Sequence, residues 1–179
     1  SVAYYGEILS NSAVGALGGP SAAGVPIAAN QTGLWQFNDN LNNSVVSGSP
    51  MAAVGGWTPS YATETINGSS ARVLSFPAFD NTQALDMPNQ ATPDAFAVPP
   101  GPPADTNVWT IVMDVKFPVI DGFTSLFETN TTLNTTDADY FIRGDFDGIG
   151  TSGQYGGTFL SNTWTRIAVT IDGSLSDQA

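Results

Sequence analysis

Residues 108–117 carry the clearest strand pattern in the chain, because their side chains alternate between apolar and polar with a period of two. One face of this strand collects large apolar residues, namely Trp109, Ile111, Met113, Val115 and Phe117. The other face carries Thr110, Asp114 and Lys116, and we expect it to meet water. A second strand of this kind is predicted at residues 164–172, where Ile167, Val169 and Ile171 point to one side.

Shorter strands are predicted at residues 33–37, 72–76 and 84–87, because each is apolar and is followed by Gly, Asn, Asp or Pro, the residues that favour turns. No stretch combines a helix cap with an apolar stripe of period 3.6. The pattern therefore predicts an antiparallel all-β domain without helices.

Residues 1–32 differ from the rest, since they are mostly small residues and carry one charge, Glu7. They hold too few large side chains to form a core by themselves. Two interpretations stay open: a flexible linker, or an extended arm that docks on the sheet edge of a neighbouring molecule. In both, residues 33–179 form the β domain.

The charge is low in density and nearly all of one sign: 16 acidic residues face 4 basic ones, a net charge of -12. Such a chain repels phosphate backbones and anionic lipids, which excludes nucleic acid as a partner. The acidity suits cations, calcium above all. No run of 18 apolar residues is present, so no membrane insertion is expected.

The chain contains neither cysteine nor histidine. This removes thiol chemistry, the usual zinc ligands and any Ser-His triad. The opening residues SVAYYG lack an initiator Met and a signal sequence, which fits a mature chain whose export signal has been removed. We therefore expect an extracellular or cell-surface protein.

Seven phrases in order carry a resemblance to one family: LWQF, VLSFPAFD, WTIVMDVKFP, TSLFETN, DADYFI, GIGTSGQYGG and NTWTRIAVTID. Together they resemble the strands and turns of LamG-like, concanavalin A-like domains of secreted bacterial surface proteins. The resemblance implies an antiparallel two-sheet jelly-roll sandwich. It also implies further strands after the last phrase, so the sandwich is expected to be incomplete at its C-terminus.

Catalytic members of this superfold carry a Glu-x-Asp-x-Glu pair of carboxylates on one strand, and retaining glycosidases need two carboxyl groups about 5 Å apart. The three glutamates of this chain, Glu7, Glu64 and Glu128, lie far apart in sequence, and the motif is absent. We therefore predict a protein that is not an enzyme.

Four aspartates in Gly-rich turns form a candidate calcium site: Asp137, Asp139, Asp145 and Asp147. Calcium binds six to eight oxygens from such carboxylates and from loop carbonyls. No distal Glu completes an EF-hand loop, but LamG-like relatives often hold one calcium at the rim of the sandwich. The alternative is ordinary turns, in which Asp is favoured, with Arg143 neutralising one of the aspartates.

Three aromatic residues in turn-like segments, Trp57, Tyr61 and Tyr155, are candidates for ligand binding, because aromatic faces stack on sugar rings and also dominate protein interfaces. Burial in the core is the alternative for each of them. By contrast, Trp35, Trp109 and Trp164 lie on strand patterns and are predicted to be core residues.

Two functions follow. The first is a non-catalytic structural or adhesive module, a self-assembling surface subunit that exchanges a strand or its arm with other copies of itself or with surface proteins. On that hypothesis, removing residues 1–32 abolishes assembly and leaves a folded domain. The second is a carbohydrate-binding, lectin-like module for polysaccharides, with or without calcium.

Overall fold

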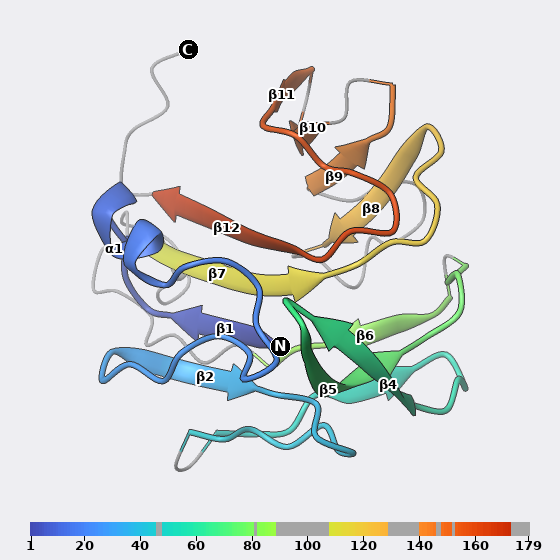
Figure 1. Cartoon of the computed structure of the whole chain (residues 1–179), viewed down its shortest axis with the longest axis horizontal. Helices are drawn as coiled ribbons and strands as arrows, with labels where there is room; N and C mark the ends of the chain where they lie inside the picture. The colour runs from blue at the N-terminus through green and yellow to red at the C-terminus, as the bar shows by residue number, and fades with distance from the viewer. Residues whose placement is uncertain are drawn as a thin grey trace, which may run out of the picture.

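The structure is a computed structural model that describes residues 1–45, 48–80, 82–88, 108–128, 140–145, 148–151 and 153–172. One helix and twelve strands occupy this part of the chain (Figure 1). They are β1 (Val2–Tyr5), α1 (Asn11–Ala16), β2 (Gln31–Trp35), β3 (Ala52–Val54), β4 (Ser60–Ile66), β5 (Ser69–Ser75), β6 (Ala84–Asp86), β7 (Val108–Val115), β8 (Phe123–Phe127), β9 (Tyr140–Arg143), β10 (Gly148–Thr151), β11 (Gln154–Gly156) and β12 (Thr165–Asp172). The predicted antiparallel all-β class is confirmed.

The longest strands, β7 and β12, pair along eight residues and anchor a four-stranded sheet of order β12-β7-β1-β2. β1 is an inner strand of this sheet, with β2 on one side and β7 on the other. Ala3, for example, lies opposite Leu34 of β2 and Val112 of β7. Segments more than a hundred residues apart in sequence therefore meet at β1.

A second four-stranded sheet, of order β11-β10-β9-β8, lies against one face of the first. Ile111 and Ile167 of the first sheet and Ile142 of the second belong to one buried cluster. Phe159, from the segment after β11, fills the same cluster and is fully buried. The result is a sandwich-like arrangement with two smaller hairpin sheets, β3-β6 and β4-β5, beside it.

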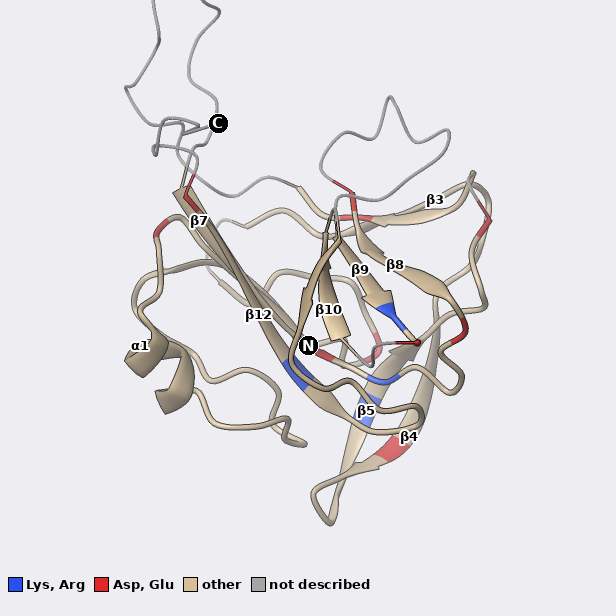
Figure 2. Cartoon of the chain, turned by 90° about the horizontal axis from the view of Figure 1, so that it is seen from above, with Lys and Arg blue, Asp and Glu red and all other residues tan. Residues whose placement is uncertain are grey.

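The opposite face of the first sheet is also covered, by residues 6–30, and this differs from the expectation that it meets water. Figure 2 shows α1 on one side of β7 and β12 and the second sheet on the other. Thr110 is fully buried there, donating to the carbonyl of Glu7 (2.9 Å) and accepting from the amide of Leu9 (3.0 Å). The polar face of β7 thus binds the backbone of the N-terminal segment.

The helix in that segment was not predicted, because six residues are too few to show a periodic stripe. Its start is nevertheless capped: the hydroxyl of Ser10 accepts from the amide of Ala13 at 3.2 Å. Val14 and Leu17 pack against the buried cluster of Ala3, Tyr5, Leu9, Val25, Leu34 and Val112. Packing on the sheet, rather than intrinsic helicity, holds so short a helix.

A buried ion pair binds the N-terminal segment to the first sheet. Arg166 of β12 lies opposite Asp114 of β7 and donates two hydrogen bonds to its carboxylate, at 2.7 and 2.8 Å. The guanidinium also donates to the carbonyls of Leu17 (2.5 Å) and Gly24 (3.0 Å) in the N-terminal segment. The two charged side chains are 6% and 1% exposed, so the pair is buried.

The structure therefore differs from the interpretation of residues 1–32 as a separate linker. Within the single chain, these residues are bound to their own sheet. The expected boundary at residue 32 cuts through the sheet, since it separates β1 and the first residues of β2 from β7 and β12. Among the residues described above, no helix is long and apolar enough to cross a membrane.

Candidate functional site

The outward face of the second sheet carries a cluster of aromatic residues around one arginine, in which Phe123 is exposed and the other rings are half-buried. The register places Phe123 of β8 opposite Arg143 of β9, and Ser125 opposite Phe141. Since neighbours along a strand point to opposite faces, these four side chains share the outer face. Thr124 and Ile142 point inward between them, and Ile142 is fully buried while Phe123 is 59% exposed.

Tyr155 reaches this cluster from the other edge of the sheet. β8 and β11 are the two edge strands, which a flat sheet would place about 14 Å apart, yet the ring centroids of Phe123 and Tyr155 are 6.2 Å apart. Gly148 and Gly150 of β10 hold the outward positions between them. Because these glycines carry no side chains, β11 can fold inward and bring Tyr155 over the sheet.

The space around these glycines excludes a side chain at Gly150 and crowds one at Gly148. A Cβ atom on Gly150 would lie 1.8 Å from the carbonyl oxygen of Gln154, and one on Gly148 would lie 3.3 Å from Cβ of Tyr155. The close approach of β11 to β10 is thus part of the geometry of the cluster.

We expect Gly150→Ala to lower the free energy of unfolding by about 1–3 kcal/mol, because the added methyl group must push β11 away from β10. Gly156→Ala in β11 is the matched control, since a Cβ there meets nothing within 4 Å, and its effect should stay within about 0.5 kcal/mol. Urea unfolding of both variants measures the difference. If the two variants were equally stable, the close approach of β11 to β10 would not contribute to the stability of the fold.

Arg143 joins the two rings. Its guanidinium carbon lies 4.9 Å from the ring centroid of Phe123 and 5.4 Å from that of Tyr155, within the range of cation–π attraction. Asp145 accepts from its Nε at 2.7 Å and from its Nη2 at 2.8 Å. These hydrogen bonds lower the pKa of Asp145 and raise that of Arg143. We name Phe123, Phe141, Arg143, Asp145 and Tyr155 the Arg143 cluster.

The cluster offers two kinds of contact on one exposed, preformed surface. The ring of Phe123 presents apolar area to solvent, while the charged groups of Arg143 and Asp145 and the hydroxyl of Tyr155 can exchange hydrogen bonds beside it. Phe123 stacks edge-on with Phe141, at 5.8 Å between centroids, so its position is fixed by neighbours on both sides. Such a surface can bind a flat ligand that has both apolar and hydroxyl groups.

Of the three aromatic residues predicted to bind ligand, only Tyr155 belongs to this cluster. Trp57 is 8% exposed and donates from its indole nitrogen to the carbonyl of Ala84 at 2.8 Å, which matches the alternative of a core residue. Its ring contacts Phe79, and Phe79 stacks on Phe76, which is 46% exposed. Trp57, Phe76 and Phe79 form a second aromatic group, whose most exposed ring, that of Phe76, is less exposed than that of Phe123.

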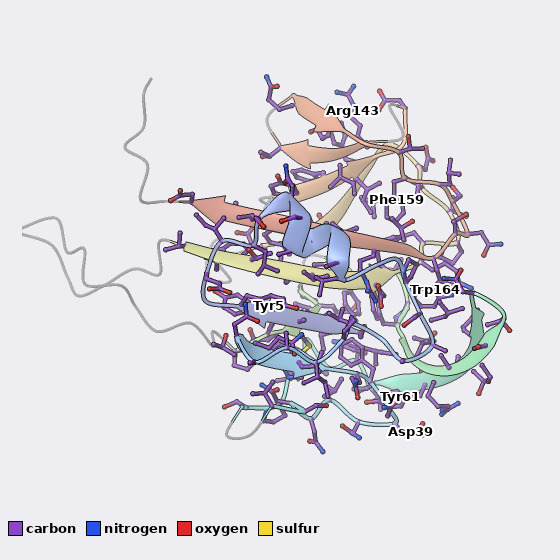
Figure 3. The ribbon with its side chains drawn as sticks, turned by 60° about the vertical axis from the view of Figure 1, so that its left-hand side comes forward. Tyr5, Asp39, Tyr61, Arg143, Phe159 and Trp164 are labelled. Atoms are coloured by element: carbon purple, nitrogen blue, oxygen red, sulfur yellow. The ribbon has the colours of Figure 1, made fainter. Side chains whose placement is uncertain are left out.

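Tyr61 lies on β4, where it packs on the buried cluster that includes Tyr4 and Trp35, and burial raises its pKa. Figure 3 shows Tyr61 and Asp39 at the opposite end of the molecule from Arg143. The structure therefore does not bring the three predicted aromatic residues together.

Three of the predicted calcium ligands, Asp137, Asp139 and Asp147, lie outside the described residues. Asp145 lies inside them and bonds to Arg143 through both carboxylate oxygens, as the alternative of a neutralising arginine predicted. Within the described ranges, no group of three or more acidic side chains could hold a metal ion.

One further concave site lies where residues 21–24 face the β4–β5 hairpin. It is a cavity of about 220 Å³ lined by Trp164, Gln36 and Asn38, among others. Its charged lining residues, Arg72 and Asp114, are already engaged with Asp39 and Arg166. The cavity is smaller than most ligand pockets.

No family model, no curated protein and no solved structure matches this chain. The resemblance to LamG-like domains stays a prediction.

Proposed function

We propose that the chain is a non-catalytic adhesive module that binds saccharides through the Arg143 cluster, at the cell surface or outside the cell. The observation that carries this proposal is the exposed ring of Phe123, held beside Tyr155 by the guanidinium of Arg143. A sugar ring has an apolar face of C–H groups and a rim of hydroxyls. It therefore matches a surface on which aromatic area and hydrogen-bonding groups alternate.

The preformed geometry supports the same function. Phe123 and Arg143 lie on paired strands of a sheet, and Tyr155 is placed by the β10–β11 hairpin. Few side chains of the cluster need to be ordered on binding, so little conformational entropy is lost. The small contact area favours weak binding per site, which suits adhesion to a polymer with many repeated sugars.

We expect Phe123→Ala to weaken saccharide binding by at least about tenfold, because it removes the most exposed ring of the cluster. A panel of plant, algal and bacterial polysaccharides, with calcium and with chelator, first identifies a ligand, and calorimetry then compares the variants. Phe76→Ala is the matched control, since Phe76 is an exposed phenylalanine of the second aromatic group. A panel without any bound polysaccharide, or a larger loss for Phe76→Ala, would contradict the proposal.

A second candidate is self-assembly by exchange of the N-terminal segment, and the inner position of β1 supports it. A strand with a neighbour on each side makes the same backbone pairs whether it comes from its own chain or from another copy. Light scattering at about 0.15 M salt, with calcium and with chelator, tests this candidate. A defined oligomer would support it, its loss in chelator would implicate the aspartate turns, and a monomer in both conditions would contradict it.

A further inference from the structure

Every basic side chain of this protein is already paired with an acidic one. The chain has 4 basic residues in all. Each lies within salt-bridge distance of a carboxylate: Arg72 with Asp39, Lys116 with Glu64, Arg143 with Asp145, and Arg166 with Asp114. The 16 acidic residues leave twelve carboxylates in excess of these four pairs. The four basic residues lie on different segments, namely β5, the position directly after β7, β9 and β12 (Figure 2).

At the Arg143 cluster this pairing uses the part of arginine that recognises anions. Two of the guanidinium nitrogens, Nε and Nη2, donate to the two oxygens of Asp145. A uronate or a sulfate on a sugar would use the same parallel pair of N–H groups. An anionic ligand that used this pair would have to displace Asp145, and one that used the Nη1 side of the guanidinium would lie close to the negative charge of Asp145.

The electrostatic field of the whole molecule also disfavours anionic ligands. A net charge of -12 repels anionic polymers before contact, and most strongly at low salt. A neutral saccharide meets neither obstacle. It stacks on Phe123 and exchanges hydrogen bonds with groups that keep their present partners.

We infer that the Arg143 cluster selects neutral saccharides over anionic ones, and that Asp145 determines this specificity by occupying the guanidinium of Arg143. The inference rests on the proposed saccharide binding at this surface. It assigns Asp145 a role different from that of a calcium ligand.

The test uses pairs of oligosaccharides of equal length that differ in the group at C6: oligogalactoside against oligogalacturonate, and oligoglucoside against oligoglucuronate. Calorimetry measures both members of each pair with the wild-type protein and with Asp145→Asn, which keeps the shape of the side chain and removes its charge. Because Asp145 is exposed on a turn, thermal melting should show an unchanged fold. Leu160→Ala changes an exposed apolar residue outside the cluster and controls for effects of a surface substitution on the measured affinities.

We expect the wild-type protein to bind the neutral member of at least one pair and its uronate at least about tenfold more weakly. In Asp145→Asn the affinity for the uronate should rise at least about tenfold relative to that for the neutral sugar. Equal wild-type affinities for the two members, or no gain of uronate binding in Asp145→Asn, would overturn the specificity and leave saccharide binding standing. Failure of the wild-type protein to bind either member of any pair would overturn the proposed function itself.

Discussion

Deleting residues 1–30 is expected to unfold the domain. β1 lies between β2 and β7 in the first sheet, so its loss divides this sheet. The deletion also uncovers Thr110, Val112 and Asp114, all of them buried under the N-terminal segment. Circular dichroism and urea unfolding of the truncated chain should show no cooperative transition.

This expectation opposes the hypothesis drawn from the sequence, in which a chain without residues 1–32 stays folded and only loses assembly. Ile27→Ser is the matched control, since Ile27 is 77% exposed in the same segment, and we expect it to leave the transition unchanged. A truncated chain that unfolds cooperatively with the stability of the full chain would show that the N-terminal layer is dispensable.

Arg166→Ala is expected to lower the free energy of unfolding by about 3–5 kcal/mol, because it leaves the carboxylate of Asp114 buried without its ionic partner. The same change removes the hydrogen bonds to the carbonyls of Leu17 and Gly24, which tie the N-terminal segment to β12. Urea unfolding measures the loss, provided that the midpoint and not the slope changes.

Two controls separate the effect of the unpaired buried charge from the effect of removing an arginine side chain. Arg72→Ala removes the arginine of a solvent-exposed pair and should have no measurable effect on the transition. The double variant Asp114→Leu with Arg166→Met replaces both charges by apolar groups and should recover much of the lost stability. If Arg166→Ala were no more costly than Arg72→Ala, the buried pair would not hold the N-terminal layer.

The sequence pattern predicts the long strands well, because β7 and β12 each show a period of two over eight residues or more. The same pattern wrongly predicts that the polar face of β7 meets water. A polar position at every second residue is typical of a solvated face, yet Thr110 and Asp114 bind groups of the N-terminal segment. Period alone cannot separate a polar residue that meets water from one that meets buried polar partners.

The sequence pattern does not predict β1, for a related reason. Ala3, Tyr4 and Tyr5 are all buried, since the strand is covered on both faces, so no alternation between apolar and polar residues marks it. The flanking small residues then favour the interpretation of a linker. Only the pairing of β1 with β2 and β7 shows that its four residues, Val2–Tyr5, lie inside a sheet.

The candidate site could be predicted in part. Its Gly-rich turns and aromatic residues single out Tyr155, and the spacing of Arg143 and Asp145 on one turn suggests their ion pair. Phe123 could not be found this way, because it reaches Tyr155 only through the strand order β11-β10-β9-β8 and the two outward glycines of β10. Strand order depends on contacts between distant segments, which a single sequence does not display.

A chemical-shift titration of the isotope-labelled chain, with a neutral oligosaccharide taken from the binding panel, locates the saccharide site. We expect the amide signals of Phe123, Arg143 and Tyr155 to shift with the same affinity, while those of Trp57 and Phe76 stay in place. Shifts confined to Trp57 and Phe76, or to the cavity beside Trp164, would contradict the assignment of binding to the outer face of the second sheet.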